Sequence, residues 1–292
     1  MQLNTATIDH VRTRRAQGES VRKIAVELGV AWQKLEKVTR PSAPGVPQAA
    51  GAPPDGHPPQ VPGGLPGAGG RLVDLYRPRT LAELCGQPEV VAYLKAYLRG
   101  PASTALLFHG QTGTGKTAAA FALAADLGCA VNDGEFGGLH VIAAGEQSAD
   151  ALRQTFERLW LRPWKGGGWK VLIVNEADRM APAVETLWLD RLENLPPRTT
   201  VVLTTNYPQR LSTRLRDRAV ALPFRSAAEE LTPDLDALFL KVWKARIGRD
   251  PTPAESADLK RIREASIQDG QVSFRRGLQH LEKHLLTRGA RS

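Results

Sequence analysis

The segment LLFHGQTGTGKTAAAFALA constrains the fold of this 292-residue chain more than any other stretch. An apolar run ends in a loop of the pattern Gly110-x4-Gly115-Lys116-Thr117, and an alanine-rich stretch follows. This order predicts a β-strand, a phosphate-binding loop and an α-helix. Glycines let backbone N–H groups curl around phosphates, and the start of the helix adds its positive dipole end. We therefore expect an α/β fold that binds a nucleotide at this loop.

The polar residues of the loop have separate expected functions. Lys116 is expected to neutralise the β and γ phosphates of ATP, and the Thr117 hydroxyl is expected to hold Mg²⁺. ATP and Mg²⁺ are accordingly the expected cofactors. The expected nucleotide-binding residues of the loop are Gly110, Gln111, Thr112, Gly113, Thr114, Gly115, Lys116 and Thr117.

Helical and β-rich patterns alternate from Arg71 onward, which predicts a parallel sheet covered by helices. We expect no strand after Phe224, where three helical patterns indicate a small all-α lid. The expected strands are 105–109, 139–143, 170–174, 200–204 and 219–224. The expected helices are 88–98, 117–127 and 149–161 around the sheet, and 231–247, 253–267 and 273–286 in the lid.

Polar residues follow two of the expected strands directly. Asn175 and Glu176 come after KVLIV, and Asn206 comes after TVVLTT. Ligands of open α/β sheets bind at the carboxyl ends of the strands. Glu176 is therefore expected to polarise the attacking water, and Asn206 to reach the γ phosphate if its strand neighbours the first one.

The segment before the sheet contains two further parts. Residues 41–70 are rich in proline and glycine, which is typical of a flexible, disordered linker. Residues 1–40 have apolar side chains at helical spacing around Gly29, which resembles a helix-turn-helix DNA-binding unit with Lys34 and Lys37 on its recognition helix. A helical pair for protein contact is the alternative. The expected domains are 1–40, 41–70 (linker), 71–226 (α/β) and 227–292 (lid).

Charge and composition favour a DNA partner. The net charge of +9 attracts nucleic acid without a specific contact. Cys85 and Cys129 lie far apart in the sequence, so we expect structural thiols rather than a zinc or redox site. No secretory start and no run of ~18 apolar residues is found, so we expect a soluble, cytoplasmic protein without a membrane partner.

Several motifs follow one another in the order of a known family. LYRPRTLAELCGQPEVVAYLKAYL precedes the loop, and VLIVNEADRM, TTN, RLRDRA and SFRRGLQHLE follow it. Over about residues 71–286, this series resembles the AAA+ ATPases of replication clamp loaders, that is, replication factor C small subunits and bacterial clamp-loader ATPase subunits. The resemblance implies that ATP binding and hydrolysis are coupled to remodelling or loading of a protein on DNA in replication or repair.

The resemblance also implies roles for residues outside the loop. Glu176 matches the catalytic glutamate, and Asn206 and Arg275 match two sensor residues. Arg218 matches the arginine finger, which in such families acts on ATP held by the neighbouring subunit. The implied partners are DNA, other AAA+ subunits, and a sliding clamp or another replication protein. Residues that match the adenine pocket are Tyr76, Arg77 and Pro78.

The chain departs from the family pattern at three points. Asn175 replaces the aspartate associated with Mg²⁺; its amide oxygen can accept from metal-bound water but has no charge. Thr117 and Asn175 are thus the expected metal-site residues, and hydrolysis is expected to be slow. Arg216-Asp217-Arg218 replaces Ser-Arg-Cys, so Arg216 is an alternative finger. The sequence ends soon after the expected lid, without the helical collar of clamp-loader subunits.

Three other functions fit parts of the sequence. A nucleotide-switched adaptor on DNA, with little hydrolysis, is favoured by Asn175. A branch-migration motor shares the RP…GQ opening, although its DNA-binding winged helix is missing after the lid. A transcription regulator with an ATPase module is a third alternative, which would bind one palindromic sequence.

Overall fold

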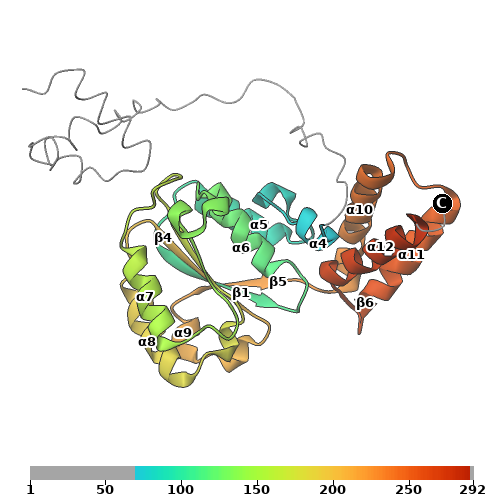
Figure 1. The fold of residues 1–292 in the computed structure, drawn as a ribbon. Helices are drawn as coiled ribbons and strands as arrows, with labels where there is room; N and C mark the ends of the chain where they lie inside the picture. The colour runs from blue at the N-terminus through green and yellow to red at the C-terminus, as the bar shows by residue number, and fades with distance from the viewer. Residues whose placement is uncertain (1–69, 290–292) are drawn as a thin grey trace, which may run out of the picture. The chain divides into compact units, whose positions relative to one another are not determined.

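A computed structural model describes residues 70–289, which form a parallel sheet with surrounding helices and a further group of C-terminal helices (Figure 1). The predicted N-terminal unit, and the linker up to residue 69, lie outside the described residues. Among residues 70–289, no helix is long and apolar enough to cross a membrane.

The sheet has five strands in the order β2-β3-β4-β1-β5, and every pairing is parallel. The predicted parallel sheet is therefore confirmed. Because β4 pairs with β1, the residues that follow these two strands lie side by side at one edge of the sheet. The strands are β1 (Thr104–Gly110), β2 (Leu139–Ile142), β3 (Lys170–Val174), β4 (Thr199–Thr205) and β5 (Val220–Phe224).

Alternate side chains of each strand point to opposite faces of the sheet, and both sets are buried because helices cover both faces. Leu106 and Phe108 face a core shared with α5 (Pro88–Leu98) and α6 (Lys116–Asp126). Ala105 and Leu107 face a core shared with the helices of the other side. Those helices are α7 (Ala149–Leu159), α8 (Pro182–Glu193) and α9 (Thr213–Arg216).

Short elements connect these layers. A four-residue helix, α4 (Leu72–Leu75), precedes the sheet, and its Leu72 packs with the C-terminal helices. The remaining elements are 3₁₀ turns: η1 (Leu81–Glu83), η2 (Val131–Gly137), η3 (Ala177–Arg179) and η4 (Pro208–Arg210).

Three helices form a C-terminal bundle with its own core. They are α10 (Ala228–Ile247), α11 (Pro253–Ser266) and α12 (Phe274–Gly289), so the three predicted helices are confirmed. Phe239, Trp243 and Leu281 are fully buried in this core. We refer to α10–α12 and the hairpin between α11 and α12 as the C-terminal bundle.

That hairpin contradicts the expectation that strands end at Phe224. β6 (Ile267–Gln268) and β7 (Gln271–Val272) pair antiparallel. Asp269 and Gly270 join them with φ of 51° and 69°, and an Asp-Gly pair with positive φ at both positions favours a two-residue hairpin turn. Strands of two residues are too short to show an alternating pattern, which is why the sequence did not reveal them.

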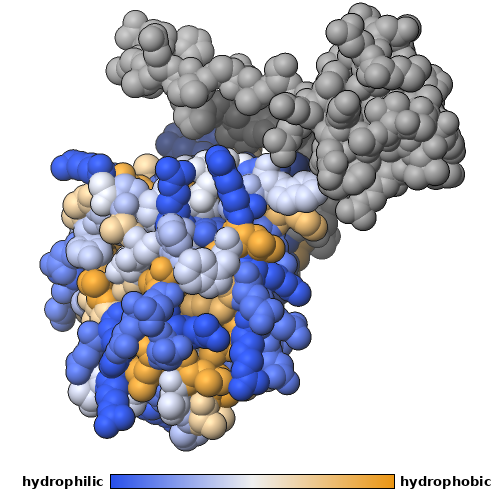
Figure 2. Space-filling view, turned by 90° about the vertical axis from the view of Figure 1, so that its left-hand side faces the viewer, coloured by the Kyte–Doolittle hydropathy of each residue, from blue (hydrophilic) through white to orange (hydrophobic). Residues whose placement is uncertain are grey.

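Large apolar side chains remain exposed around the end of α7. Trp164 is 88% exposed and Phe136 is 68% exposed, and their rings meet edge to face. Trp160 and Leu161 are also exposed. We call these four residues the aromatic patch. Figure 2 shows hydrophobic side chains between hydrophilic ones on the side of the molecule that lies to the left in Figure 1.

Candidate nucleotide-binding site

The predicted phosphate-binding loop connects β1, which ends at Gly110, to α6, which begins at Lys116. Gly110 and Gly113 have φ of 141° and 80°, a region that residues with a side chain rarely adopt. A Cβ on Gly113 would lie 2.0 Å from the Ser273 Oγ, and one on Gly110 would lie 2.4 Å from the Phe224 carbonyl oxygen. Both positions therefore require glycine.

Lys116 is buried and bonded to oxygens of the site. Its Nζ donates to the carbonyl oxygens of Gly110 at 2.8 Å and Gln111 at 2.7 Å, and to the Asn206 Oδ1 at 2.8 Å. Burial, followed by the positive charge of Arg275, lowers the pKa of Lys116 from 10.5 to about 8, while Asp178 acts in the opposite direction. Phosphate oxygens are the acceptors that would relieve this burial best, because they carry the compensating negative charge.

Thr117, in the first turn of α6, and Asn175, directly after β3, lie in contact at the carboxyl edge of the sheet. The Thr117 Oγ1 donates to the Asn175 Oδ1 at 3.0 Å, and the Thr204 Oγ1 donates to the same oxygen at 3.3 Å. Residues 70–289 contain no group of three or more His, Cys, Asp and Glu residues that could hold a metal ion. A hydroxyl and an amide oxygen fit Mg²⁺, which usually keeps several waters and relies on substrate phosphates instead of an all-protein cage.

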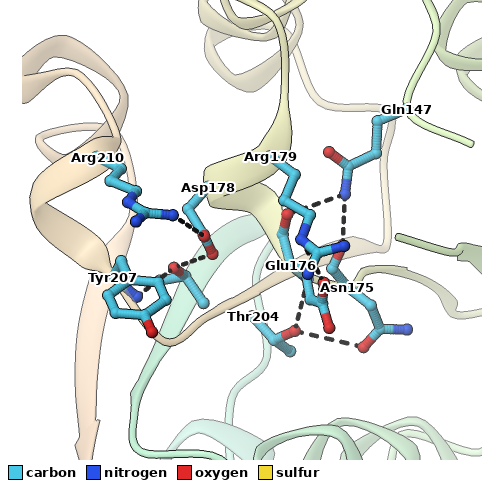
Figure 3. A network of polar contacts seen from close by, with 9 residues as sticks. Gln147, Asn175, Glu176, Asp178, Arg179, Thr204, Tyr207 and Arg210 are labelled. Atoms are coloured by element: carbon cyan, nitrogen blue, oxygen red, sulfur yellow. Dashed lines mark hydrogen bonds and ion pairs between the residues drawn. The ribbon is translucent and has the colours of Figure 1, made fainter. Parts of the chain in front are cut away.

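Glu176 sits in a strained turn after β3. Its φ of 53° is left-handed, which costs of order 1–3 kcal/mol for a residue other than glycine. Two contacts hold its backbone: its N–H donates to the Thr204 Oγ1 at 3.3 Å, and its carbonyl accepts from the Gln147 Nε2 at 3.2 Å. Gln147 also donates to the Asn175 carbonyl. The Glu176 carboxylate pairs with the Arg179 Nε at 2.7 Å (Figure 3).

A second part of this network supports the end of β4. The Asp178 carboxylate is nearly buried and accepts from the Thr205 Oγ1, which in turn accepts from the Tyr207 N–H. Arg210 lies 3.8 Å from Asp178 and over the ring of Tyr207 (Figure 3). These contacts fix the turn that carries Asn206 toward Lys116.

The remaining predicted site residues differ in where they lie. Arg275 lies in the first turn of α12, and its charge reaches Lys116. Tyr76 packs against the core of the C-terminal bundle, and Arg77 lies over the ring of Phe121 in α6, with Pro78 half-buried beside it in sequence. The structure thus brings Lys116, Thr117, Asn175, Asn206 and the charge of Arg275 to one place.

Arg218 makes its contacts on the α8 and α9 side of the sheet. Its Nε donates to the Glu193 Oε1 at 2.8 Å, and its Nη1 donates to the Arg214 carbonyl at 3.0 Å. Arg216 is exposed and donates to the Thr213 Oγ1 at 3.2 Å. Among residues 70–289, Arg218 has a carboxylate partner and Arg216 has none within ion-pair distance.

Three residues that support the site from outside were not predicted to do so. Gln147 lies in a loop, and no pattern in the sequence marks it. Ser273 is buried against Gly113 because α12 begins beside the loop. Gln87 belongs to the GQ pair of the motif LYRPRTLAELCGQ, which the sequence analysis singled out. The motif did not predict which atoms Gln87 contacts.

Comparison with known proteins agrees with the geometry. Residues 106–222 match the family described as ATPase family associated with various cellular activities (AAA). The replication factor C small subunit of Archaeoglobus fulgidus is 31% identical over 159 residues, or 54% of this chain and 49% of that protein. That of Thermofilum pendens is 32% identical over 156 residues, or 52% and 47%. Residues 106–222 of this chain thus form an AAA domain.

This AAA domain includes β1 from Leu106 onward, the phosphate-binding loop, and the turns after β3 and β4. The chain spans about half the length of the curated relatives it matches. Among solved structures, a variant of Thermotoga maritima RuvB is similar with a TM-score of 0.47 and 22% identity, over 71% of this chain and 72% of that chain.

Proposed function

We propose that this chain binds ATP·Mg²⁺ and hydrolyses it as a DNA-associated ATPase of the clamp-loader type, coupling the reaction to remodelling or loading of a protein on DNA. One observation carries the proposal: a buried, positively charged Lys116 bonds to two loop carbonyls and to Asn206, beside the pair formed by Thr117 and Asn175. This arrangement provides a place for phosphates and for the cation that accompanies them.

The residues have distinct roles in the proposed reaction, in which water and ATP yield ADP and phosphate. Lys116 exchanges the loop carbonyls for β and γ phosphate oxygens, and Asn206 orients the γ phosphate or the water. Glu176 orients and polarises the attacking water once its carboxylate leaves Arg179. Bound Mg²⁺ would neutralise phosphate charge, held through Thr117 and Asn175. Arg275 adds a positive charge from α12.

DNA and further protein subunits are the proposed partners. The net charge of +9 supports an association with DNA. The aromatic patch supports a protein partner, which could be another subunit or a sliding clamp. Backbone hydrogen bonds hold the patch in place: the N–H groups of Trp164 and Lys165 donate to the Phe136 carbonyl at 3.0 and 3.1 Å. A preorganised aromatic surface loses little entropy on binding.

A nucleotide-switched adaptor is the second candidate, and Asn175 is the observation that favours it. The Asn175 amide accepts from Thr117 and Thr204 but adds no negative charge beside the cation. Binding without turnover would follow if the lost charge weakens the hold on Mg²⁺ in the transition state more than in the ground state.

The substitution Asn175→Asp separates the two candidates. We expect it to raise the rate of phosphate release roughly tenfold, because a carboxylate holds a hard cation more strongly than an amide does. Phosphate release from ATP is measured at saturating Mg²⁺, with Asn194→Asp as an exposed control for the added charge.

Slow but measurable turnover by the wild type supports the ATPase, and Asn194→Asp should equal the wild type. A wild type that binds ATP without releasing phosphate, together with turnover by Asn175→Asp, would establish the switch. No gain in Asn175→Asp over an active wild type would show that the amide serves the reaction as well as a carboxylate.

ATP affinity should depend on pH because of Lys116. Its pKa is about 8 in the free protein, and a bound triphosphate raises that pKa because its negative charge favours the protonated amine. Binding therefore takes up a proton above pH 8, and affinity should fall by up to roughly tenfold per pH unit there. Below the free-protein pKa, this group should have no effect.

Equilibrium binding of ATP at pH 7 to 10 measures this dependence. The variant Arg275→Ala removes a positive charge that lowers the pKa of Lys116, so the fall in affinity should begin at a higher pH, whatever the change in affinity at neutral pH. An affinity that is constant up to pH 10 would contradict the assigned role of Lys116.

A further inference from the structure

Gln87 is a buried amide that contacts both the phosphate-binding loop and the chain entering the C-terminal bundle. It is 2% exposed and precedes α5. Its Nε2 donates to the Arg225 carbonyl at 2.9 Å, and its Oε1 accepts from the Arg225 N–H at 2.8 Å. The same Nε2 lies 3.5 Å from the Thr114 carbonyl, at the outer limit of a hydrogen bond.

This pattern requires an amide. The side chain donates from nitrogen to two carbonyls and accepts at oxygen from one N–H group, which neither a carboxylate nor an apolar side chain of the same length can do. A buried amide that uses most of its hydrogen-bonding capacity on backbone atoms is expensive to leave unpaired, so the contact specifies one arrangement of the two segments.

On one side of Gln87 the contacts lead to the phosphates. Lys116 Nζ donates to the Gln111 carbonyl, and the Thr114 Oγ1 donates to that same oxygen at 2.8 Å. Phosphates would take Lys116 away from the Gln111 carbonyl. The turn from Gln111 to Thr114 would then lose a charged hydrogen bond, and its conformation should change.

On the other side the contacts lead into the C-terminal bundle. Arg225 connects β5 to α10, and its guanidinium pairs with Glu230 in the first turn of α10 and with Glu89 in α5. The next residues pair with the hairpin: the Val272 N–H donates to the Ser226 carbonyl, and the Ala228 N–H to the Gly270 carbonyl, each at 2.8 Å. The hairpin therefore moves with this connector.

A second contact joins the same parts. The Phe274 N–H, at the start of α12, donates to the Gly113 carbonyl at 3.0 Å. Gly113 and Thr114, adjacent residues of the phosphate-binding loop, are thus both linked to the C-terminal bundle, one directly and one through Gln87.

We propose that Gln87 is a positioning residue that transmits the nucleotide state of the phosphate-binding loop to the C-terminal bundle. The proposal rests on the proposed binding of ATP at this loop. Gln87 touches no phosphate; it holds the Arg225 connector to the Thr114 carbonyl, so that a rearranged loop displaces the connector and the hairpin paired with it.

Hydrogen–deuterium exchange tests this proposal in the full chain. The probe is the non-hydrolysable β,γ-imido analogue of ATP with Mg²⁺, and the readout is amide exchange in segments 225–231 and 267–275. We expect the analogue to change exchange there by about threefold or more in the wild type. In Gln87→Glu the analogue should still bind within about threefold of the wild-type Kd, but the exchange change in segment 225–231 should be lost, because this segment is linked to the loop through Gln87.

Two further variants keep the test decisive. Gln268→Glu makes the same substitution at an exposed position of the hairpin and should behave as the wild type. Gln87→Met, which keeps the side-chain length without hydrogen bonds, replaces Gln87→Glu if that variant does not fold. A purely structural role would lower the melting temperature of the Gln87 variants while leaving the analogue-induced exchange change in place.

An exchange change of wild-type size in the Gln87 variants would overturn the proposal. So would an unchanged exchange pattern in a wild type that binds the analogue. A wild type that fails to bind the analogue would overturn both this proposal and the proposed function. Failure of this proposal alone is therefore recognised by a wild type that still binds the analogue.

Discussion

Replacing Lys116 with alanine should weaken ATP binding roughly 100-fold and remove detectable hydrolysis, because at least two charge-assisted hydrogen bonds to phosphates are lost. Lys116 is the buried cation of the site, and its three present acceptors are uncharged oxygens. The variant should still fold, because it loses these three hydrogen bonds but also loses the free-energy cost of burying the Lys116 charge.

Equilibrium binding of a fluorescent ATP analogue measures this loss. Lys165→Ala is the matched control, because Lys165 is an exposed lysine paired with Asp133 at 2.7 Å. It should bind as the wild type does. Wild-type affinity in Lys116→Ala would mean that phosphates bind elsewhere, and a loss in both variants would point to a general effect of charge.

Replacing Arg218 with alanine should leave ATP binding within about threefold of the wild type but reduce hydrolysis roughly 100-fold or more in the assembled protein. Arg218 contacts Glu193 and the Arg214 carbonyl on the α8 and α9 side of the sheet. If it acts as a finger on the ATP of a neighbouring subunit, it must leave this ion pair on assembly. An exposed pair of this kind opens at a small cost.

Rates of phosphate release at increasing protein concentration test this role, since a finger acting between subunits gives a rate per chain that rises with assembly. Arg216→Ala is the control and should differ from the wild type by less than about threefold. Loss of activity in Arg216→Ala but not in Arg218→Ala would move the finger to Arg216. Full activity in both variants would exclude either arginine as a finger.

The parts of the fold and site that could be predicted are those set by short stretches of sequence. A strand, a glycine loop and a helix follow one another between Thr104 and Asp126, and each has a local pattern. The alternation of helical and β-rich patterns after Arg71 predicted a parallel sheet. The meeting of Asn206 with Lys116 followed from this sheet, provided that β4 lies beside β1, which it does.

The parts that could not be predicted depend on residues far apart in the sequence. Gln87 and Arg225 are separated by 138 positions, and their contact exists only because α5 packs against β5. The ion pair between Glu193 and Arg218 likewise depends on how α8 and α9 meet. Alignment with a family pattern places a residue on an element but does not show its partners.

Phosphate release from ATP·Mg²⁺, with and without primed or forked DNA, tests the central claim most directly. Wild type and Lys116→Ala are compared at matched concentrations. We predict slow release by the wild type that DNA increases, and no release by Lys116→Ala under either condition. Equal release by both proteins, or none by a wild type that also fails to bind ATP, would contradict the assignment of this chain as a DNA-associated ATPase.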